Sequence, residues 1–206
     1  MFNGLKILLN NMLEKIKDLY TENIQTQISA SRLLPETIVE ATTKLVSCLL
    51  RGNKIIVCGH GRSYANAQFL VANLLNRYEL ERPSFPSVLL TIDSAVGSAI
   101  VSDNHITTLY QRQFNAIAQQ GDILVALVPN SGDESIINVI NCATNKDVEI
   151  IALTGANDDH LQGLISENDL EVQTPAIKES RILEGHLFII NALCELIDHT
   201  LFTQSG

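Results

Sequence analysis

Short apolar runs rich in Val, Ile and Leu alternate along this chain with longer segments of helical periodicity, and this alternation restricts the fold strongly. Parallel strands buried on both faces have continuous apolar runs, and the crossovers between them need a dozen or more residues. The runs that fit are residues 54–58, 88–92, 123–128, 149–153 and 170–173. We therefore predict an α/β fold, a three-layer αβα sandwich around a five-stranded parallel sheet.

Helices are expected at both ends of the chain. Near the N-terminus, apolar side chains recur every three or four residues, which predicts an amphipathic helix; they are Leu13, Ile16, Tyr20, Ile24 and Ile28. A second helix is expected over 35–51, and a long terminal helix over 178–202. Residues 1–11 lack the small-residue cleavage site of a signal peptide, so we expect an N-terminal extension followed by one domain over 12–206.

The terminal helix has more apolar surface than one packed face requires. One stripe is Leu183, Leu187, Ile190, Cys194, Ile197 and Leu201, and the other is Ile182, Ile189, Leu193 and Leu196. A single packed face needs one stripe about 100° wide. We therefore expect a second subunit to cover the other stripe, and predict a homo-oligomer.

Composition excludes several classes of function. The net charge is −9 and the pI is about 4.9, so the basic footprint of a nucleic-acid binder is missing. No apolar run reaches the ~18–20 residues of a membrane span. The four cysteines form no C-x-x-C pair and the five histidines have no metal-ligand spacing, so we expect no metal and no cofactor, and a reducing cytoplasm.

The first candidate site is the segment Gly59-His60-Gly61-Arg62-Ser63, between a predicted strand and a helix. Two glycines allow backbone N–H groups to approach an anion, and a helix N-terminus and the Ser63 hydroxyl would add to a phosphate cradle. A tight turn with Ser63 as the helix N-cap explains the same residues. Without a partner nearby in the sequence, His60 is expected to be a loop residue rather than a catalyst.

The second candidate is the segment Asn130–Ser135, after the third predicted strand. Asp133 and Glu134 fall at the start of a predicted helix, where carboxylates are stabilised by the helix dipole and would repel a phosphate. We expect them to cap the helix.

The third candidate is the group Glu179, Arg181, Glu184 and His186 in the terminal helix. Glu184 and His186 are two residues apart, so their side chains do not face each other. We expect these four side chains to be ion-paired or solvated rather than an acid–base pair.

From about Met12 to its end, the chain resembles the sugar isomerase (SIS) domain family. Within that family it is similar to phosphoheptose isomerases, and more similar to proteins that associate with the replication initiator DnaA. The matching strings are TENIQTQI (21–28), GNKI to CG (52–59), ANAQ (65–68), NRYELERPS (76–84), IIALTG (150–155) and LCELIDHTLF (193–202).

The chain departs from the isomerases at the positions that transfer protons. Asn73, Leu183 and Asn191 stand where the resemblance implies acid–base groups. An aldose–ketose isomerase needs a base and an acid, and amide and alkyl side chains supply neither. The resemblance therefore implies a pseudo-isomerase whose vestigial sugar-phosphate pocket keeps Gly59, Gly61, Ser63, Arg77, Asp93 and Ser131.

The resemblance implies a non-catalytic homotetramer that binds DnaA and promotes its assembly at the chromosomal origin, without contacting nucleic acid or membrane. Leu201 and Phe202, carried over from the match, are the expected contact residues. They form an apolar pair followed by only four residues. The alternatives are a phosphoheptose isomerase acting on sedoheptulose 7-phosphate, or a module that binds a sugar phosphate without converting it.

Overall fold

The computed structural model describes residues 2–103, 105–129, 133–156, 161 and 163–202. In chain order the elements are α1 (Phe2–Leu33), α2 (Pro35–Leu50), β1 (Ile55–Gly59), α3 (Ser63–Leu75), β2 (Ser87–Leu89), α4 (Ala95–Ser102), the 3-10 helix η1 (Ile106–Thr108), α5 (Leu109–Ile117), β3 (Ile123–Val128), α6 (Glu134–Asn145), β4 (Glu149–Gly155), β5 (Leu170–Thr174) and α7 (Glu179–Phe202).

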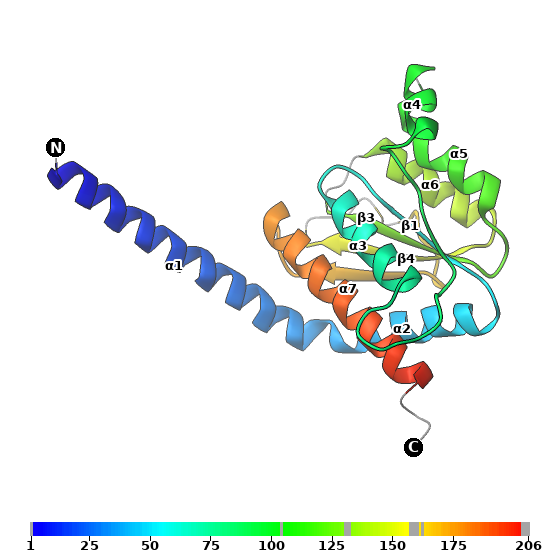
Figure 1. Cartoon of the computed structure of the whole chain (residues 1–206), viewed down its shortest axis with the longest axis horizontal. Helices are drawn as coiled ribbons and strands as arrows, with labels where there is room; N and C mark the ends of the chain where they lie inside the picture. The colour runs from blue at the N-terminus through cyan, green and yellow to red at the C-terminus, as the bar shows by residue number, and fades with distance from the viewer. Residues whose placement is uncertain (1, 104, 130–132, 157–160, 162, 203–206) are drawn as a thin grey trace.

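The five strands form one parallel sheet, as the alternation of runs predicted. Their order in the sheet is β2-β1-β3-β4-β5. The side chains of successive residues in each strand point to opposite faces of the sheet. Ile55 and Val57 of β1 join one apolar core, whereas Ile56 and Cys58 join another. Helices α2, α3 and α7 cover the first core, and α4, α5 and α6 cover the second (Figure 1). The three-layer αβα sandwich is therefore confirmed.

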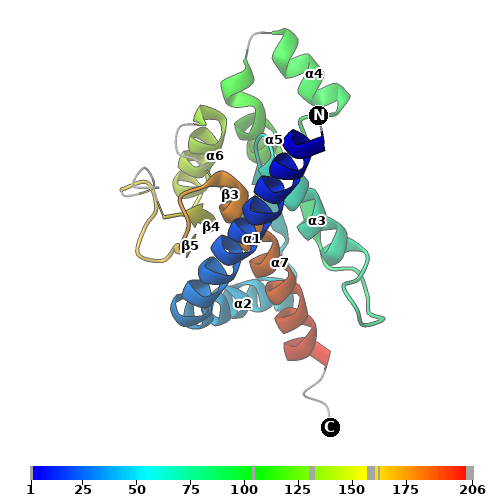
Figure 2. The same cartoon turned by 90° about the vertical axis from the view of Figure 1, so that its left-hand side faces the viewer.

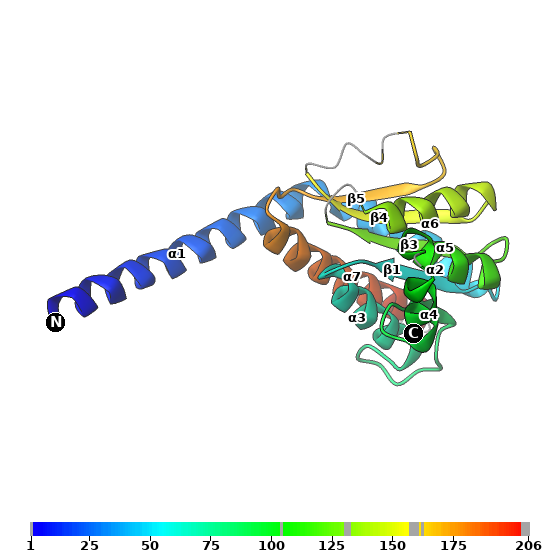
Figure 3. The same ribbon diagram turned by 90° about the horizontal axis from the view of Figure 1, so that it is seen from above.

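Helix α1 extends away from this sandwich. It contacts α2 and α7 only near its C-terminal end, and the rest projects from the body in Figures 1 and 3 and toward the viewer in Figure 2. Its 32 residues span about 48 Å. The helix passes through residue 12 without a break, so the predicted boundary between residues 1–11 and the domain is not a boundary between elements.

The apolar stripe of α1 lies at the surface. Tyr20 is 68% exposed, and Leu13, Ile16 and Ile24 are about half exposed. Exposed apolar stripes of this kind are typical of surfaces that contact another chain.

Most of the apolar side chains in both stripes of α7 are buried within the chain itself. Helix α7 is in contact with α1, α2, α3 and the strands β4 and β5, and its residues Ile182, Ile189, Leu193 and Cys194 are buried. Leu187, at 39% exposure, is the exposed member of the two stripes. The two stripes of α7 therefore do not require a second subunit. The exposed apolar stripe of α1 is better evidence that the chain associates with another copy.

From the sequence, a helix is expected to follow the segment Gly59–Ser63 and to run to about Tyr78, but α3 ends three residues earlier, at Leu75. The Arg82 guanidinium explains the difference, because it donates hydrogen bonds to the backbone oxygens of Asn73 at 2.8 Å and Leu74 at 3.1 Å. The last carbonyls of a helix have no partner within it, and here a side chain from the following loop satisfies two of them. The chain can therefore leave the helix at this point.

Candidate functional site

A cavity of about 310 Å³ lies where β1 and β3 end. The strand order turns in opposite directions from these two strands, and ligands of open α/β sheets bind at such switch points, beyond the carboxyl ends of the strands. The residues that line this cavity are His60, Gly61, Arg62, Ser63, Leu127, Val128, Pro129, Asp133, Ile136 and Glu179. The first two candidate segments of the sequence therefore meet at one place.

The turn after β1 requires its two glycines. A Cβ atom on Gly59 would lie 2.9 Å from the backbone oxygen of Ser63, so glycine allows the first turn of α3 to lie directly on the strand. Gly61 has φ +58°, a left-handed conformation that side chains disfavour. Both glycines are explained by the path of the chain, without a ligand.

Ser63 does not have the N-cap role considered from the sequence. Arg62 occupies the N-cap position of α3, so the prediction of Ser63 as N-cap is wrong. The Ser63 side chain is fully buried, and its hydroxyl donates to the backbone oxygens of His60 at 2.7 Å and Leu127 at 3.3 Å. This hydroxyl joins the two loops to each other, and its hydrogen is used in doing so.

Asp133 caps α6, as predicted. Its Oδ1 accepts hydrogen bonds from the backbone N–H groups of Ser135 at 2.9 Å and Ile136 at 3.4 Å, and from the Ser135 hydroxyl. Glu134 lies beside it in the first turn and is exposed. Of the two carboxylates predicted to cap this helix, only Asp133 therefore does so.

His60 has partners that the sequence did not reveal. Its Nε2 lies 3.4 Å from Oδ2 of Asp133, and its Nδ1 lies 3.5 Å from the Tyr110 hydroxyl. The buried Tyr110 donates that hydroxyl to the backbone oxygen of Gly59 at 2.7 Å, and burial raises the pKa of the phenol strongly. His60 lies in the loop between β1 and α3, as expected, and both partners come from distant segments of the chain. Asp133 and Tyr110 are separated from it by 73 and 50 positions in the sequence.

The remaining residues predicted for the pocket are only partly brought together. Asp93 accepts a hydrogen bond from the Tyr64 hydroxyl at 2.6 Å, close to the start of α3, and burial raises the pKa of Tyr64 to about 12. Arg77 lies beyond the other end of α3, about 20 Å along the 13-residue helix, where it pairs with Glu81 at 2.9 Å. Ser131 lies outside the described residues.

The three positions where the resemblance implied acid–base groups lie on adjacent helices, α3 and α7. The Asn66 amide of α3 donates to the backbone oxygen of Leu183 at 3.0 Å, which places the two helices side by side. Nδ2 of Asn73 and Oδ1 of Asn191 are buried and have no hydrogen-bond partner within the described part of the chain. At these three positions the two helices therefore carry two amides and a leucine.

The polar residues of α7 have mixed roles. Glu179 pairs with Arg62 at 2.6 Å, and Arg181 pairs with Glu22 and Glu184, so the prediction of ion pairing is confirmed for these three. His186 differs, because it is fully buried and its Nε2 lies 3.1 Å from the backbone oxygen of Thr154. Burial lowers the pKa of His186 to about 4, so its imidazole is neutral.

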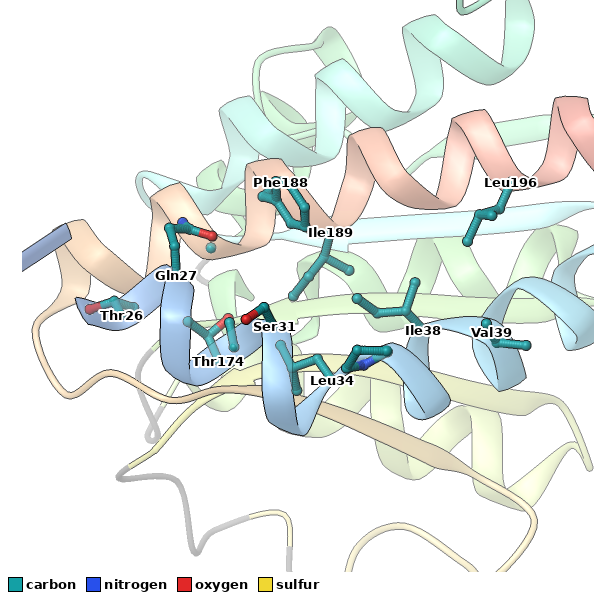
Figure 4. A pocket seen from close by; sticks show the side chains of 13 residues that line it. Thr26, Gln27, Ser31, Leu34, Ile38, Val39, Thr174, Phe188, Ile189 and Leu196 are labelled. Atoms are coloured by element: carbon teal, nitrogen blue, oxygen red, sulfur yellow. The ribbon is translucent and has the colours of Figure 1, made fainter. Parts of the chain in front are cut away.

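A second cavity of about 310 Å³ lies where α1, α2 and α7 meet, and its walls are mainly apolar. Figure 4 shows Phe188, Ile189 and Leu196 on one side and Leu34 and Ile38 on the other, with the hydroxyl side chains at one end. The groove contains no titratable side chain among its described lining residues, so it is not suited to acid–base chemistry.

The C-terminal end of α7 is held by the loop that follows α3. Arg82, buried to 1% exposure, pairs with Asp198 at 2.6 Å and lies 3.9 Å above the centre of the Phe85 ring. The Phe202 ring also stacks on Phe85, with the ring centres 6.1 Å apart. Phe202 remains 41% exposed, whereas Leu201 is half-buried against the core.

Within the described residues, no three His, Cys, Asp or Glu side chains are grouped so that they could hold a metal ion. No helix in that part of the chain is both long and apolar enough to cross a bilayer.

Comparisons with known proteins agree with this geometry. The SIS domain model matches residues 19–155. A phosphoheptose isomerase of Shewanella halifaxensis is 45% identical over 94% of this chain and 98% of its own length. The DnaA initiator-associating protein DiaA of Enterobacter sp. (strain 638) is 44% identical over 93% of this chain and 97% of its own.

A solved phosphoheptose isomerase from Francisella tularensis has the same fold, with a TM-score of 0.87 and 33% identity over 91% of this chain and 98% of that one. The family model covers well over half of the chain, and two relatives with different names match nearly all of it. The chain therefore belongs to the SIS domain family.

Proposed function

We propose that this chain is a non-catalytic homotetramer of the SIS family that binds the replication initiator DnaA and promotes its assembly at the chromosomal origin. The nature of the residues at the proton-transfer positions carries the proposal. Asn73, Leu183 and Asn191 can neither accept nor donate a proton near neutral pH. A general acid and a general base each contribute roughly 10²–10⁴ to a rate, so losing both removes several orders of magnitude.

The surface proposed for DnaA is the end of α7. Phe202 offers an exposed aromatic face, and its stacking on Phe85 holds that face in one orientation. Aromatic residues held rigidly in this way are favourable anchors, because little side-chain freedom is lost on binding. Leu201 contributes beside it, although part of its side chain supports the core.

The charge of the chain supports a protein partner rather than DNA. With a net charge of −9, the chain as a whole repels the phosphate backbone. We therefore propose that DnaA contacts the DNA. The SIS protein binds DnaA in the cytoplasm and itself contacts neither nucleic acid nor membrane.

Self-assembly gives the proposal its mechanism. The exposed stripe of α1 is the surface expected to contact other copies. An oligomer with one α7 end per subunit holds several DnaA molecules close together, and this raises their effective concentration for assembly.

The test is retention of purified DnaA on the immobilised chain, compared between wild type and Phe202→Ala. We expect wild type to retain DnaA and the variant to lose most of it, since aromatic anchors are often worth 2 kcal/mol or more. Phe69→Ala is the matched control, because Phe69 is also a phenylalanine at 41% exposure but lies on α3. Failure of wild type to retain DnaA would contradict the function, and equal loss in both variants would contradict the contact assignment.

The alternative function is phosphoheptose isomerisation, which the name of the Shewanella halifaxensis relative favours. Turnover of sedoheptulose 7-phosphate distinguishes it from our proposal. We expect conversion no faster than in buffer, and enzymatic turnover would replace the proposal with the alternative.

A further inference from the structure

The cavity between β1 and β3 has the surroundings of an anion site. Two helices of more than ten residues, α3 and α6, begin beside it, and their N-termini favour negative charge. The free backbone N–H groups at each of these helix ends need hydrogen-bond acceptors.

At α6 the acceptor is a carboxylate of the chain itself. Oδ1 of Asp133 accepts the N–H groups of Ser135 and Ile136 and the hydroxyl of Ser135. These are the types of donor that a phosphate would use at a helix N-terminus. They are already occupied by a group of the same charge sign.

The second oxygen of the same carboxylate points to the other loop. Oδ2 of Asp133 lies 3.4 Å from Nε2 of His60, which precedes α3. His60 is in turn near the hydroxyl of Tyr110, and that hydroxyl donates to Gly59. One carboxylate therefore joins the helix end at β3 to the loop at β1, across the cavity.

Among the described residues that line the cavity, the other groups do not compensate for this carboxylate. Arg62, the cation on the rim, pairs with the carboxylate of Glu179 at 2.6 Å. The Ser63 hydroxyl donates to two backbone oxygens, and Pro129 has no N–H to offer. A phosphate entering here would meet two carboxylates and one cation that is already paired.

We propose that the Asp133 carboxylate is a built-in substitute for the phosphate of a sugar phosphate, and that it makes this cavity reject phosphate esters. Asp133 is then a residue that determines specificity. Its replacement by a smaller neutral side chain removes the repulsion and leaves the amides at α6 with an uncharged partner, which a phosphate can displace. This inference goes beyond the proposed function, because it concerns what the cavity excludes rather than what the end of α7 binds.

The experiment is calorimetric titration of wild type and Asp133→Ser with inorganic phosphate and with glucose 6-phosphate, at constant ionic strength. Serine is also a favourable N-cap, so the helix start is kept. We expect no measurable binding to wild type and a gain of at least about tenfold in affinity for the variant. Glu134→Ser is the matched control, because it removes the same charge from the next residue, which is exposed. It should behave as wild type.

Two outcomes overturn the inference: wild type binding either ligand as tightly as Asp133→Ser, or Glu134→Ser giving the same gain. Asp133→Asn keeps the size of the side chain and removes only its charge, so it tests the inference if the serine variant is poorly folded. A folded Asp133→Asn without any gain in affinity also overturns it.

The result is separable from the DnaA proposal. Asp133 lies near the first turn of α7 and Phe202 lies at its last residue, about 36 Å along the 24-residue helix. Retention of DnaA by the same variants is expected to be unchanged.

Discussion

His186 shows how burial fixes the state of a single residue. Its imidazole is fully buried in α7, donates one hydrogen bond from Nε2 to the Thr154 backbone oxygen, and has a pKa lowered to about 4 by burial. An unfolded chain has a histidine pKa near 6.5. Between these two values the unfolded state binds a proton that the folded state does not. Folding stability from this residue is therefore complete above about pH 6.5 and is lost as the pH falls toward 4.

We predict that lowering the pH from 7.5 to 5.5 decreases the unfolding free energy of wild type by about 1 kcal/mol more than that of His186→Gln. Glutamine removes the titration and keeps a polar group. Urea denaturation at both pH values and one protein concentration measures the difference. The same pH dependence in both proteins would show that His186 is not buried in its neutral form.

At the scale of elements, one side chain joins the ends of two helices. Arg82 donates to two backbone oxygens at the end of α3 and pairs with Asp198 near the end of α7. A guanidinium has donors in a fixed fork, whereas an ammonium is a single point of charge. Lysine at this position could pair with Asp198 but could not also satisfy both carbonyls.

We predict that Arg82→Lys loses about 1–3 kcal/mol of stability, the cost of leaving buried polar groups unsatisfied. Hydrogen exchange should increase in the last turn of α3 and leave the strands unchanged. Arg77→Lys is the control, because its partner Glu81 is 86% exposed and such surface pairs contribute little. Equal effects of the two substitutions would argue against a special role for Arg82.

Contacts that are local in sequence were predictable, and contacts between distant segments were not. The cap of α6 follows from Asp133 standing two and three residues before the amides that it accepts. The alternation of apolar runs was sufficient to predict a five-stranded parallel sheet. The early end of α3 was not predictable, because the group that ends it comes from the following loop. The partners of His60 were missed for the same reason, since Tyr110 belongs to another strand–helix crossover.

At the scale of the whole molecule, the fold separates three surfaces. The strand order places the cavity with Asp133 at the carboxyl edge of the sheet, and α7 carries Phe202 to the other end of the subunit. Helix α1 passes the first turn of α7 and carries the N-terminal part of its apolar stripe away from the sandwich (Figure 1). A subunit of this shape can associate through α1 without covering the end of α7 by the same contact.

Single-molecule mass measurement of a mixture with DnaA shows whether an oligomer of this chain gathers several DnaA molecules. Ile16→Glu/Ile24→Glu, which places charges on the α1 stripe, should reduce both the mass of the oligomer and the number of DnaA molecules bound; Lys15→Glu, on the opposite side of α1, should change neither. For wild type we predict four copies alone, and complexes with two or more DnaA molecules when DnaA is added. A mixture in which no species exceeds the mass of either protein measured alone would contradict the account.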